Sequence, residues 1–217
     1  MNQLTAIQQF AVWVLPVLFA ITVHEVAHGF VADLLGDKTA RIMGRLTLNP
    51  IKHIDLVGTI LVPAILFIFG GFIFGWAKPV PISARNFKKP RRDMMFVAAA
   101  GPLSNLIMMV LWALIAKLGI FLTQYGFNWA LAIAYMGGAG IMINSALAIL
   151  NLIPIPPLDG GHILMGLLPA KWAAKVSRIE PYGFFILLFL LATGLLKYLI
   201  APMTFLLQAF IPTWLGF

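Results

Sequence analysis

Four long apolar runs, separated by shorter polar segments, dominate the pattern of hydrophobic and polar positions along the chain. They cover about residues 9–35, 94–122, 129–153 and 182–200, and a shorter apolar stretch follows at 202–217. A helix needs about 20 apolar residues to cross a hydrocarbon core of roughly 30 Å, so the long runs are candidate spans. The pattern predicts an all-α polytopic membrane protein with about five to six transmembrane helices.

The apolar segment 56–76 has the length of one span, but Pro63, Gly70, Gly71 and Gly75 interrupt it. The loop before it, residues 36–55, carries four basic residues, and the loop after it, residues 77–93, carries six. A single crossing would put these two loops on opposite sides, although Lys and Arg favour the cytoplasmic side. We therefore expect a re-entrant or hairpin segment, with the amino terminus outside and both basic loops in the cytoplasm.

Residues 41–48 alternate between charged and apolar side chains, which predicts a short amphipathic β-strand or β-hairpin at the membrane surface. No internal repeat, low-complexity run or appended soluble domain is visible in the pattern. We expect residues 1–217 to form one membrane-embedded domain, with its core at 9–168 and accessory helices at 182–217.

Composition supports a membrane protein, because 10% of the residues are charged and 61% are hydrophobic, whereas soluble domains carry about a quarter charged residues. The net charge of +8 would suit nucleic acid, but 13 of the 15 Lys and Arg lie in segments 36–55, 77–93 and 169–181. Basic cytoplasmic loops explain this distribution, so we expect a lipid bilayer and no nucleic-acid partner. The chain has no cysteine, so a metal would need His, Asp, Glu or Asn.

The first apolar run contains a His-Glu-x-x-His motif, formed by His24, Glu25 and His28. Ionisable side chains inside a span are costly and mark functional sites. At about 100° per residue the two histidines lie one turn apart on one helix face, where both imidazoles reach a single ion. A glutamate beside them is placed to take a proton from water, which is the general-base arrangement of zinc hydrolases.

A catalytic zinc site usually has three protein ligands, so a third ligand must come from elsewhere. Asn151, Asp159 and His162 are the polar candidates in apolar surroundings. We favour Asp159, because prolines before it and glycines after it break the helix, and unwound backbone at membrane depth needs a wet cavity. A helix-capping role for Asp159 stays open. We expect His162 to line the cavity or to support a ligand.

These motifs resemble those of the site-2 protease family of intramembrane zinc metalloproteases. The resemblance rests on His24–His28, on Gly101-Pro102-Leu103-Ser104-Asn105 and on Asn151–Gly160, and residues 44–55 and 75–81 resemble the compact prokaryotic branch. It implies one Zn²⁺ per chain bound by His24, His28 and Asp159. It also implies that Glu25 activates water and that Asn151 positions the substrate or stabilises the tetrahedral intermediate. The implied substrates are transmembrane segments of membrane proteins. Nothing in the chain corresponds to the PDZ or CBS domain of many members.

Other interpretations of single residues stay open. Asn151 can instead bond to the backbone at the end of its helix. The set Gly101–Asn105 is interpreted as packing between helices, without a chemical role. We expect a surface or capping role for His53 and Asp55, and an ion pair with a loop Lys or Arg for Asp33. Glu180, which precedes a proline, is disfavoured as a metal ligand.

Two other functions compete with proteolysis. His and Asp near the middle of a membrane also mark ion pathways, so a metal transporter or channel is the first alternative. A catalytically inactive module that binds membrane proteins is the second. The expected topology puts both histidines in the cytoplasmic half of their span, so we expect cleavage near the cytoplasmic face. The resemblance to the compact prokaryotic branch implies an integral protein of a prokaryotic plasma membrane.

Overall fold

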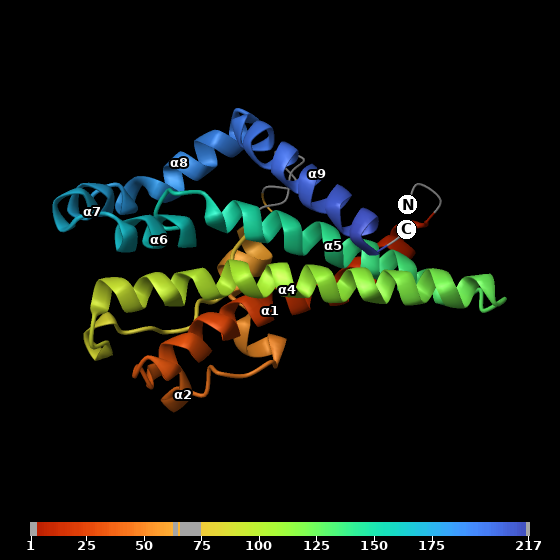
Figure 1. Ribbon diagram of the computed structural model, residues 1–217, viewed down its shortest axis with the longest axis horizontal. Helices are drawn as coiled ribbons and strands as arrows, with labels where there is room; N and C mark the ends of the chain where they lie inside the picture. Colours follow the sequence, from red (N-terminus) through yellow and green to blue (C-terminus); the bar gives the residue numbers. More distant parts are fainter. Residues whose placement is uncertain (1–3, 63–64, 66–74, 216–217) are drawn as a thin grey trace.

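The computed structural model describes residues 4–62, 65 and 75–215, which form helices joined by loops and contain no strand. Its helices α1 (Ala6–Leu34), α4 (Pro90–Gln124) and α5 (Ala130–Leu152) are long and apolar enough to cross a membrane. Figure 1 shows them arranged along the longest axis of the molecule. The shorter helices at the carboxyl-terminal side are α6 (Asp159–Leu167), α7 (Ala170–Ser177), α8 (Glu180–Ala192) and α9 (Leu195–Leu215).

Between α1 and α4 the described residues form short helical turns, which are α2 (Thr39–Ile42), η1 (Pro50–His53), η2 (Leu56–Leu61) and η3 (Ala84–Asn86). The predicted β-hairpin at 41–48 is therefore wrong for this structure. The Asp37 carboxylate accepts a hydrogen bond from the Thr39 backbone N–H, which starts a helical turn, and Gly44 turns the chain with a φ of +62°. Both features interrupt the extended conformation that the charge alternation favoured.

The candidate span at 182–200 is divided into two helices in the structure. Helices α8 and α9 meet at an angle of 84°, and the apolar stretch from residue 202 continues α9. Gly194, with a φ of +73°, lies at the bend, where a left-handed conformation ends α8. The described residues give three candidate spans, or four if the bent pair counts as one, which is below the expected five to six.

The two ends of segment 56–76 lie side by side. The Trp76 backbone N–H donates to the Gly58 carbonyl (3.0 Å), and the Thr59 hydroxyl donates to the Trp76 carbonyl (2.9 Å). The interior of the predicted hairpin, residues 63–64 and 66–74, lies outside the described residues. The segment therefore returns close to the point at which it starts.

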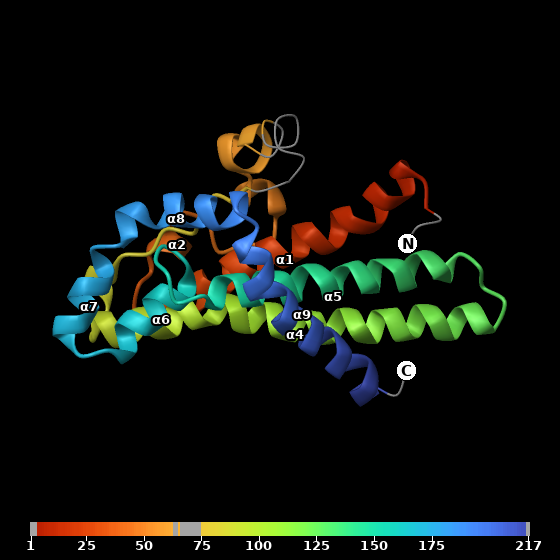
Figure 2. The same ribbon diagram turned by 90° about the horizontal axis from the view of Figure 1, so that it is seen from above.

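Small residues close the antiparallel pair α4–α5, which runs along one side of the molecule (Figure 2). A Cβ atom added at Gly137 would lie 2.5 Å from the backbone nitrogen of Ala116, and one added at Gly140 would lie 2.1 Å from the Trp112 ring. Helix association in lipid depends on such close packing, because burial of apolar surface gains little there. This rigid pair forms the platform against which α1 and α6 place their side chains.

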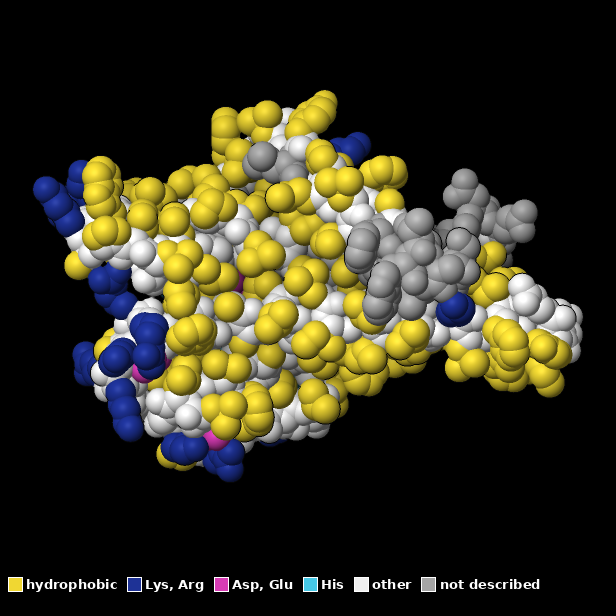
Figure 3. Space-filling view, in the orientation of Figure 1, with side chains coloured by type: hydrophobic (Ala, Val, Ile, Leu, Met, Phe, Trp, Pro, Cys, Tyr) yellow, Lys and Arg dark blue, Asp and Glu magenta, His cyan; other side chains and the backbone are white. Residues whose placement is uncertain are grey.

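Lys and Arg side chains gather at one end of the molecule, around α7 and the first turn of α4, and hydrophobic side chains cover the flank of the helices (Figure 3). This distribution suits an apolar flank in lipid and a basic end at an aqueous surface. His28 lies six residues and His24 ten residues before the end of α1 at Leu34. At a rise of about 1.5 Å per residue, these positions are about 9 and 15 Å from that helix end.

Candidate metal centre and active site

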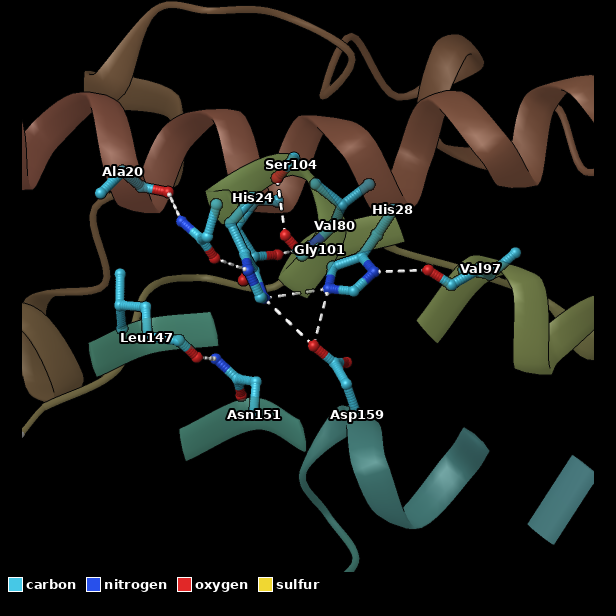
Figure 4. Close-up of polar contacts among 12 residues, drawn as sticks. Ala20, His24, His28, Val80, Val97, Gly101, Ser104, Leu147, Asn151 and Asp159 are labelled. Carbon is cyan, nitrogen blue, oxygen red and sulfur yellow. Dashed lines mark hydrogen bonds and ion pairs between the residues drawn. The ribbon is translucent and has the colours of Figure 1, made fainter. Parts of the chain in front are cut away.

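His24, His28 and Asp159 come together at one point between α1 and α6 (Figure 4). The Nε2 atoms of the two histidines are 3.1 Å apart, and they lie 3.3 and 3.4 Å from Asp159 Oδ2. Both histidines are buried, and each residue is 8% exposed. No other group of three His, Cys, Asp or Glu side chains with this spacing occurs among the described residues.

The hydrogen-bond network assigns the tautomer of each imidazole. His28 Nδ1 lies 2.7 Å from the Val97 carbonyl, which only accepts, so Nδ1 carries the proton. His24 Nδ1 lies 2.6 Å from Asn105 Oδ1. The Asn105 amide nitrogen donates to the Ala20 carbonyl, so its Oδ1 must be the acceptor, and His24 Nδ1 also carries its proton. In neutral histidines both Nε2 lone pairs therefore face Asp159.

Three lone-pair donors that face one another repel unless a cation lies between them. Asp159 Oδ2 is buried and accepts no conventional hydrogen bond, as expected for a ligand atom. In a tetrahedral zinc site with bonds of about 2.0–2.1 Å, neighbouring ligand atoms lie about 3.3 Å apart. The separations of 3.1, 3.3 and 3.4 Å match this edge length, so the donor set fits a zinc ion and leaves one position open.

Glycines bring Asp159 to the histidines. Asp159 is the first residue of α6, and the chain reaches it through the proline-rich segment that follows α5. A Cβ atom at Gly160 would lie 2.3 Å from the Leu152 carbonyl oxygen, and one at Gly161 would lie 2.4 Å from the Pro156 nitrogen. Only residues without a side chain let α6 fold back this tightly, so the helix break predicted around Asp159 is confirmed.

Gly101 of α4 makes room for both imidazoles. A Cβ atom there would lie 2.4 Å from His28 Nε2 and 2.5 Å from His24 Cε1. The prediction of close helix packing around Gly101 is confirmed, and the structure adds that the neighbours are the two candidate ligands. Any larger residue would occupy the space in front of the donor atoms.

Asn105 has a role that the sequence interpretation missed. It is fully buried, accepts from His24, and donates its second amide hydrogen to Asn144 Oδ1 at 2.9 Å. Asn144, also fully buried, donates to the Gly140 carbonyl, which fixes its own orientation. The Asn144 side chain of α5 thus orients Asn105 of α4, and Asn105 in turn orients the His24 ring. Two amides in the middle of apolar helices are the sequence signal that could have indicated it, because such groups need partners in a membrane.

Glu25 lies on the face of α1 next to that of the histidines. Its Oε2 atom accepts a hydrogen bond of 3.0 Å from the Val80 backbone N–H, and no hydrogen bond to Oε1 is found among the described residues. One oxygen of the candidate base is therefore held, and the other is free to take a proton.

The two remaining polar candidates lie outside the donor cluster. Asn151, in the last turn of α5, donates to the Leu147 carbonyl at 3.0 Å, which is the structural interpretation of this residue (Figure 4). An amide nitrogen has two hydrogens, so one donor remains for a ligand. His162 lines a separate cavity of about 370 Å³ between α4, α6 and α7. The expected hydrogen bond from His162 to a candidate ligand is not found among the described residues.

Other sequence expectations have clear outcomes. Asp33 forms ion pairs with Arg41 (2.6 Å) and Lys38 (3.1 Å), and Asp55 caps η2 through the Val57 and Gly58 N–H groups, as predicted. A surface position for His53 is wrong, because its ring is 3% exposed and lies 2.8 Å from the Thr47 carbonyl. This contact buries the ring by closing the loop. Glu180 is exposed at the start of α8.

Comparisons with known proteins identify several related chains. Residues 118–193 match the profile described as peptidase family M50. "Putative zinc metalloprotease YwhC" of Bacillus subtilis is 41% identical over 198 residues, which cover 88% of this chain and 84% of that protein. "Putative zinc metalloprotease Rip2" of Mycolicibacterium smegmatis is 31% identical over 182 residues, covering 83% of this chain and 66% of Rip2. "Putative zinc metalloprotease Rip2" of Mycobacterium tuberculosis strain Erdman is 29% identical over 171 residues, which cover 75% of this chain and 62% of that protein. No solved structure gives a significant match.

The relationship to YwhC extends over most of both chains, and the profile match covers the end of α4 and all of α5, α6, α7 and α8. These matches and the apolar helices together indicate an integral membrane protein, and the matches indicate zinc as its cofactor. The chain belongs to peptidase family M50, the site-2 protease family of zinc metalloproteases.

Proposed function

We propose that this chain is an intramembrane protease, which hydrolyses peptide bonds within transmembrane segments of other membrane proteins. The observation that carries the proposal is the cluster of donor atoms from His24, His28 and Asp159. The two histidines lie on the apolar helix α1, which also carries Glu25. The three side chains hold one zinc ion per chain. When bound there, zinc supplies Lewis-acid chemistry, which polarises the scissile carbonyl and makes water a better proton donor.

The side chains of the protein supply the proton transfer and the positioning. Glu25 takes the proton of the attacking water at Oε1, while Oε2 stays on the Val80 N–H. It then gives this proton to the amine that leaves, as a general base that becomes a general acid. The remaining Asn151 N–H donates to the substrate backbone and holds the carbonyl beside the metal. Asn105 and Val97 keep both imidazoles in the required tautomer.

The substrate must unwind locally at the site. In an intact helix the scissile carbonyl accepts a hydrogen bond from four residues further on, and side chains shield it. Helix-breaking residues near the cleaved bond therefore favour cleavage. Because the histidines lie near the basic end of α1, and basic loops favour the cytoplasm, the active site lies toward the cytoplasmic face of the plasma membrane.

The contact between Gly58 and Trp76 supports a re-entrant or hairpin path for segment 56–76. If its two ends lie on one side, then the basic loops before and after it share the cytoplasmic side. Residues 9–168 are the protease core under this proposal, and residues 182–217 are accessory helices.

The proposal is tested by cleavage of a membrane-protein substrate in proteoliposomes. Glu25→Gln lowers the cleavage rate by at least about 100-fold, because a general base contributes about 10²–10⁴-fold. Zinc content stays at the wild-type value. Glu180→Gln is the matched control, since it makes the same change on an exposed helix end, and it cleaves at the wild-type rate.

Two outcomes contradict the proposal. One is full cleavage by Glu25→Gln with zinc still bound, because a catalytic base is indispensable. The other is zinc flux across the proteoliposome membrane that Glu25→Gln leaves unchanged, in the absence of cleavage, which would favour the transporter alternative.

A further inference from the structure

Helix α1 presents two neighbouring faces to different parts of the chain. His24 and His28 face α4 and α6, whereas Glu25 and Gly29, one turn apart, face the extended segment around Val80. A Cβ atom at Gly29 would lie 2.8 Å from Val80 Cγ1, so the absence of a side chain lets this segment lie against the helix. The metal ligands and the candidate base are thus held from different sides.

The segment Pro79-Val80-Pro81 offers a single backbone donor. Proline has no N–H, so the Val80 N–H is the one amide hydrogen of these three residues. It donates to Glu25 Oε2, with 3.0 Å between the Val80 nitrogen and this oxygen. The two proline rings also restrict the backbone on both sides of Val80 to extended conformations. The donor is therefore presented in a fixed direction.

Both ends of this segment are anchored. The Arg45 guanidinium donates to the Lys78 carbonyl at 2.9 Å, and the Lys78 N–H donates to the His53 carbonyl at 2.9 Å. On the other side, the Ser83 N–H donates to Asp37 Oδ2 at 2.7 Å. The Val80 side chain is 5% exposed. These contacts fix the donor independently of the metal ligands.

We infer that Val80 is a positioning residue of the protease, whose backbone N–H holds Oε2 of Glu25 and so directs Oε1 toward the attacking water. The inference rests on the proposed function of Glu25. A hydrogen bond from N–H to a carboxylate is charge-assisted and stronger in surroundings that exclude water. The Val80 N–H acts on the orientation of the base, and therefore on kcat, while substrate affinity is set elsewhere.

The hydrogen bond can be detected without any substrate. The chain has two Pro-Val pairs, Pro16-Val17 and Pro79-Val80, so labelling proline carbonyls with ¹³C and valine nitrogens with ¹⁵N isolates two amide signals in detergent. Glu25→Ala shifts the Val80 amide proton upfield, because the acceptor is lost, and leaves Val17, more than two helical turns away, in place. Glu180→Gln moves neither signal. An unchanged Val80 signal in Glu25→Ala overturns the inference.

The catalytic consequence is tested by replacing the Val80 amide with an ester, through incorporation of the corresponding hydroxy acid. This change removes the N–H and keeps the side chain. We expect kcat to fall about 10- to 100-fold, the value of one hydrogen bond to a charged group, with KM and zinc content unchanged. An ester at Ile82 is the matched control, since its N–H makes no hydrogen bond among the described residues, and it retains the wild-type kcat.

The outcomes separate the two proposals. If Glu25→Gln cleaves normally, the proposed function fails, whatever Val80 does. If Glu25→Gln is inactive but the Val80 ester has the wild-type kcat, the positioning inference alone fails. If the ester protein does not fold, the amide shift in Glu25→Ala decides.

Discussion

His24 Nδ1 lies 2.6 Å from Oδ1 of Asn105, a residue 81 positions further along the chain and fully buried in α4. The contact fixes the His24 ring so that Nε2 faces the donor cluster. Partners of this kind are typical of histidines that bind metals, and their loss usually lowers metal affinity about 10- to 100-fold. Asn105 therefore supports the candidate metal centre without being one of its candidate ligands.

Asn105→Ala should lower zinc affinity about 10- to 100-fold, because it frees the His24 ring. It also leaves Asn144 Oδ1 buried without its donor, which costs about 1–3 kcal/mol of stability. Competition with a chelator measures the affinity, and thermal unfolding measures the stability. Asn128→Ala, in the exposed loop before α5, is the control. Equal zinc affinity in wild type and Asn105→Ala would refute this role.

Gly101→Ala should remove zinc binding and activity. The added methyl group would lie 2.4 Å from His28 Nε2, so the ring must leave the cluster or α4 must move away from α1. Gly138→Ala provides a control, since a Cβ atom there meets nothing within 4 Å and alanine favours the helix by about 1 kcal/mol. Zinc content per chain checks both variants. Normal zinc in Gly101→Ala would show that the cluster is looser than described.

Asn151→Ala should lower kcat about tenfold without changing zinc content, if its remaining N–H donates to the substrate backbone. The purely structural interpretation, in which Asn151 only bonds to the Leu147 carbonyl, predicts a change in stability and none in kcat. Cleavage kinetics together with thermal unfolding separate the two interpretations.

Asp37 links acid stability to the loop that carries Val80. Burial raises the pKa of this carboxyl, but hydrogen bonds from Thr39, Ser83 and Asn86 outweigh it, so its pKa lies below the ordinary 3.8. The folded state thus favours the carboxylate, whose stabilising effect is full above about pH 4 and is lost as the pH falls through the lowered pKa. Asp37→Asn should unfold more readily than wild type at pH 7.

The same comparison at low pH provides the check. Thermal unfolding midpoints of wild type and Asp37→Asn should begin to converge below about pH 4, where the unfolded carboxyl takes up a proton, and should converge further as the pH falls through the lowered pKa of the folded carboxyl. A difference between the two proteins that stays constant from pH 7 to pH 3 would contradict a role of the ionised carboxylate.

Cysteine accessibility tests the path of segment 56–76. The chain has no native cysteine, so single cysteines in place of Lys52 and Lys88 report their side of the membrane without background. Both should react with a membrane-impermeant reagent from the cytoplasmic side. Labelling from opposite sides would show that the segment crosses once.

The members of the donor cluster could be chosen from the sequence because their signals are local. Two histidines one turn apart share a helix face in any α-helix, and a carboxylate between prolines and glycines marks a helix break. The structure brings Asp159 to these histidines, 131 positions after His28. Local patterns were therefore sufficient to choose the residues, although not to define their distances.

The supporting contacts could not be predicted, because they depend on tertiary packing. Nothing local links Asn105 to His24, or the Val80 N–H to Glu25. The β-hairpin expected at 41–48 failed for a related reason, since the Asp37 carboxylate and Gly44 determine the backbone there. The bend at Gly194 likewise divides an apolar run that hydropathy alone treats as continuous.

The most direct test of the central claim is the zinc content per chain, measured by mass spectrometry on purified, folded protein. We predict about one zinc in wild type and in His162→Ala, and almost none in His28→Ala and Asp159→Ala. Wild type without zinc, or Asp159→Ala with full zinc, would contradict the metal centre described by His24, His28 and Asp159.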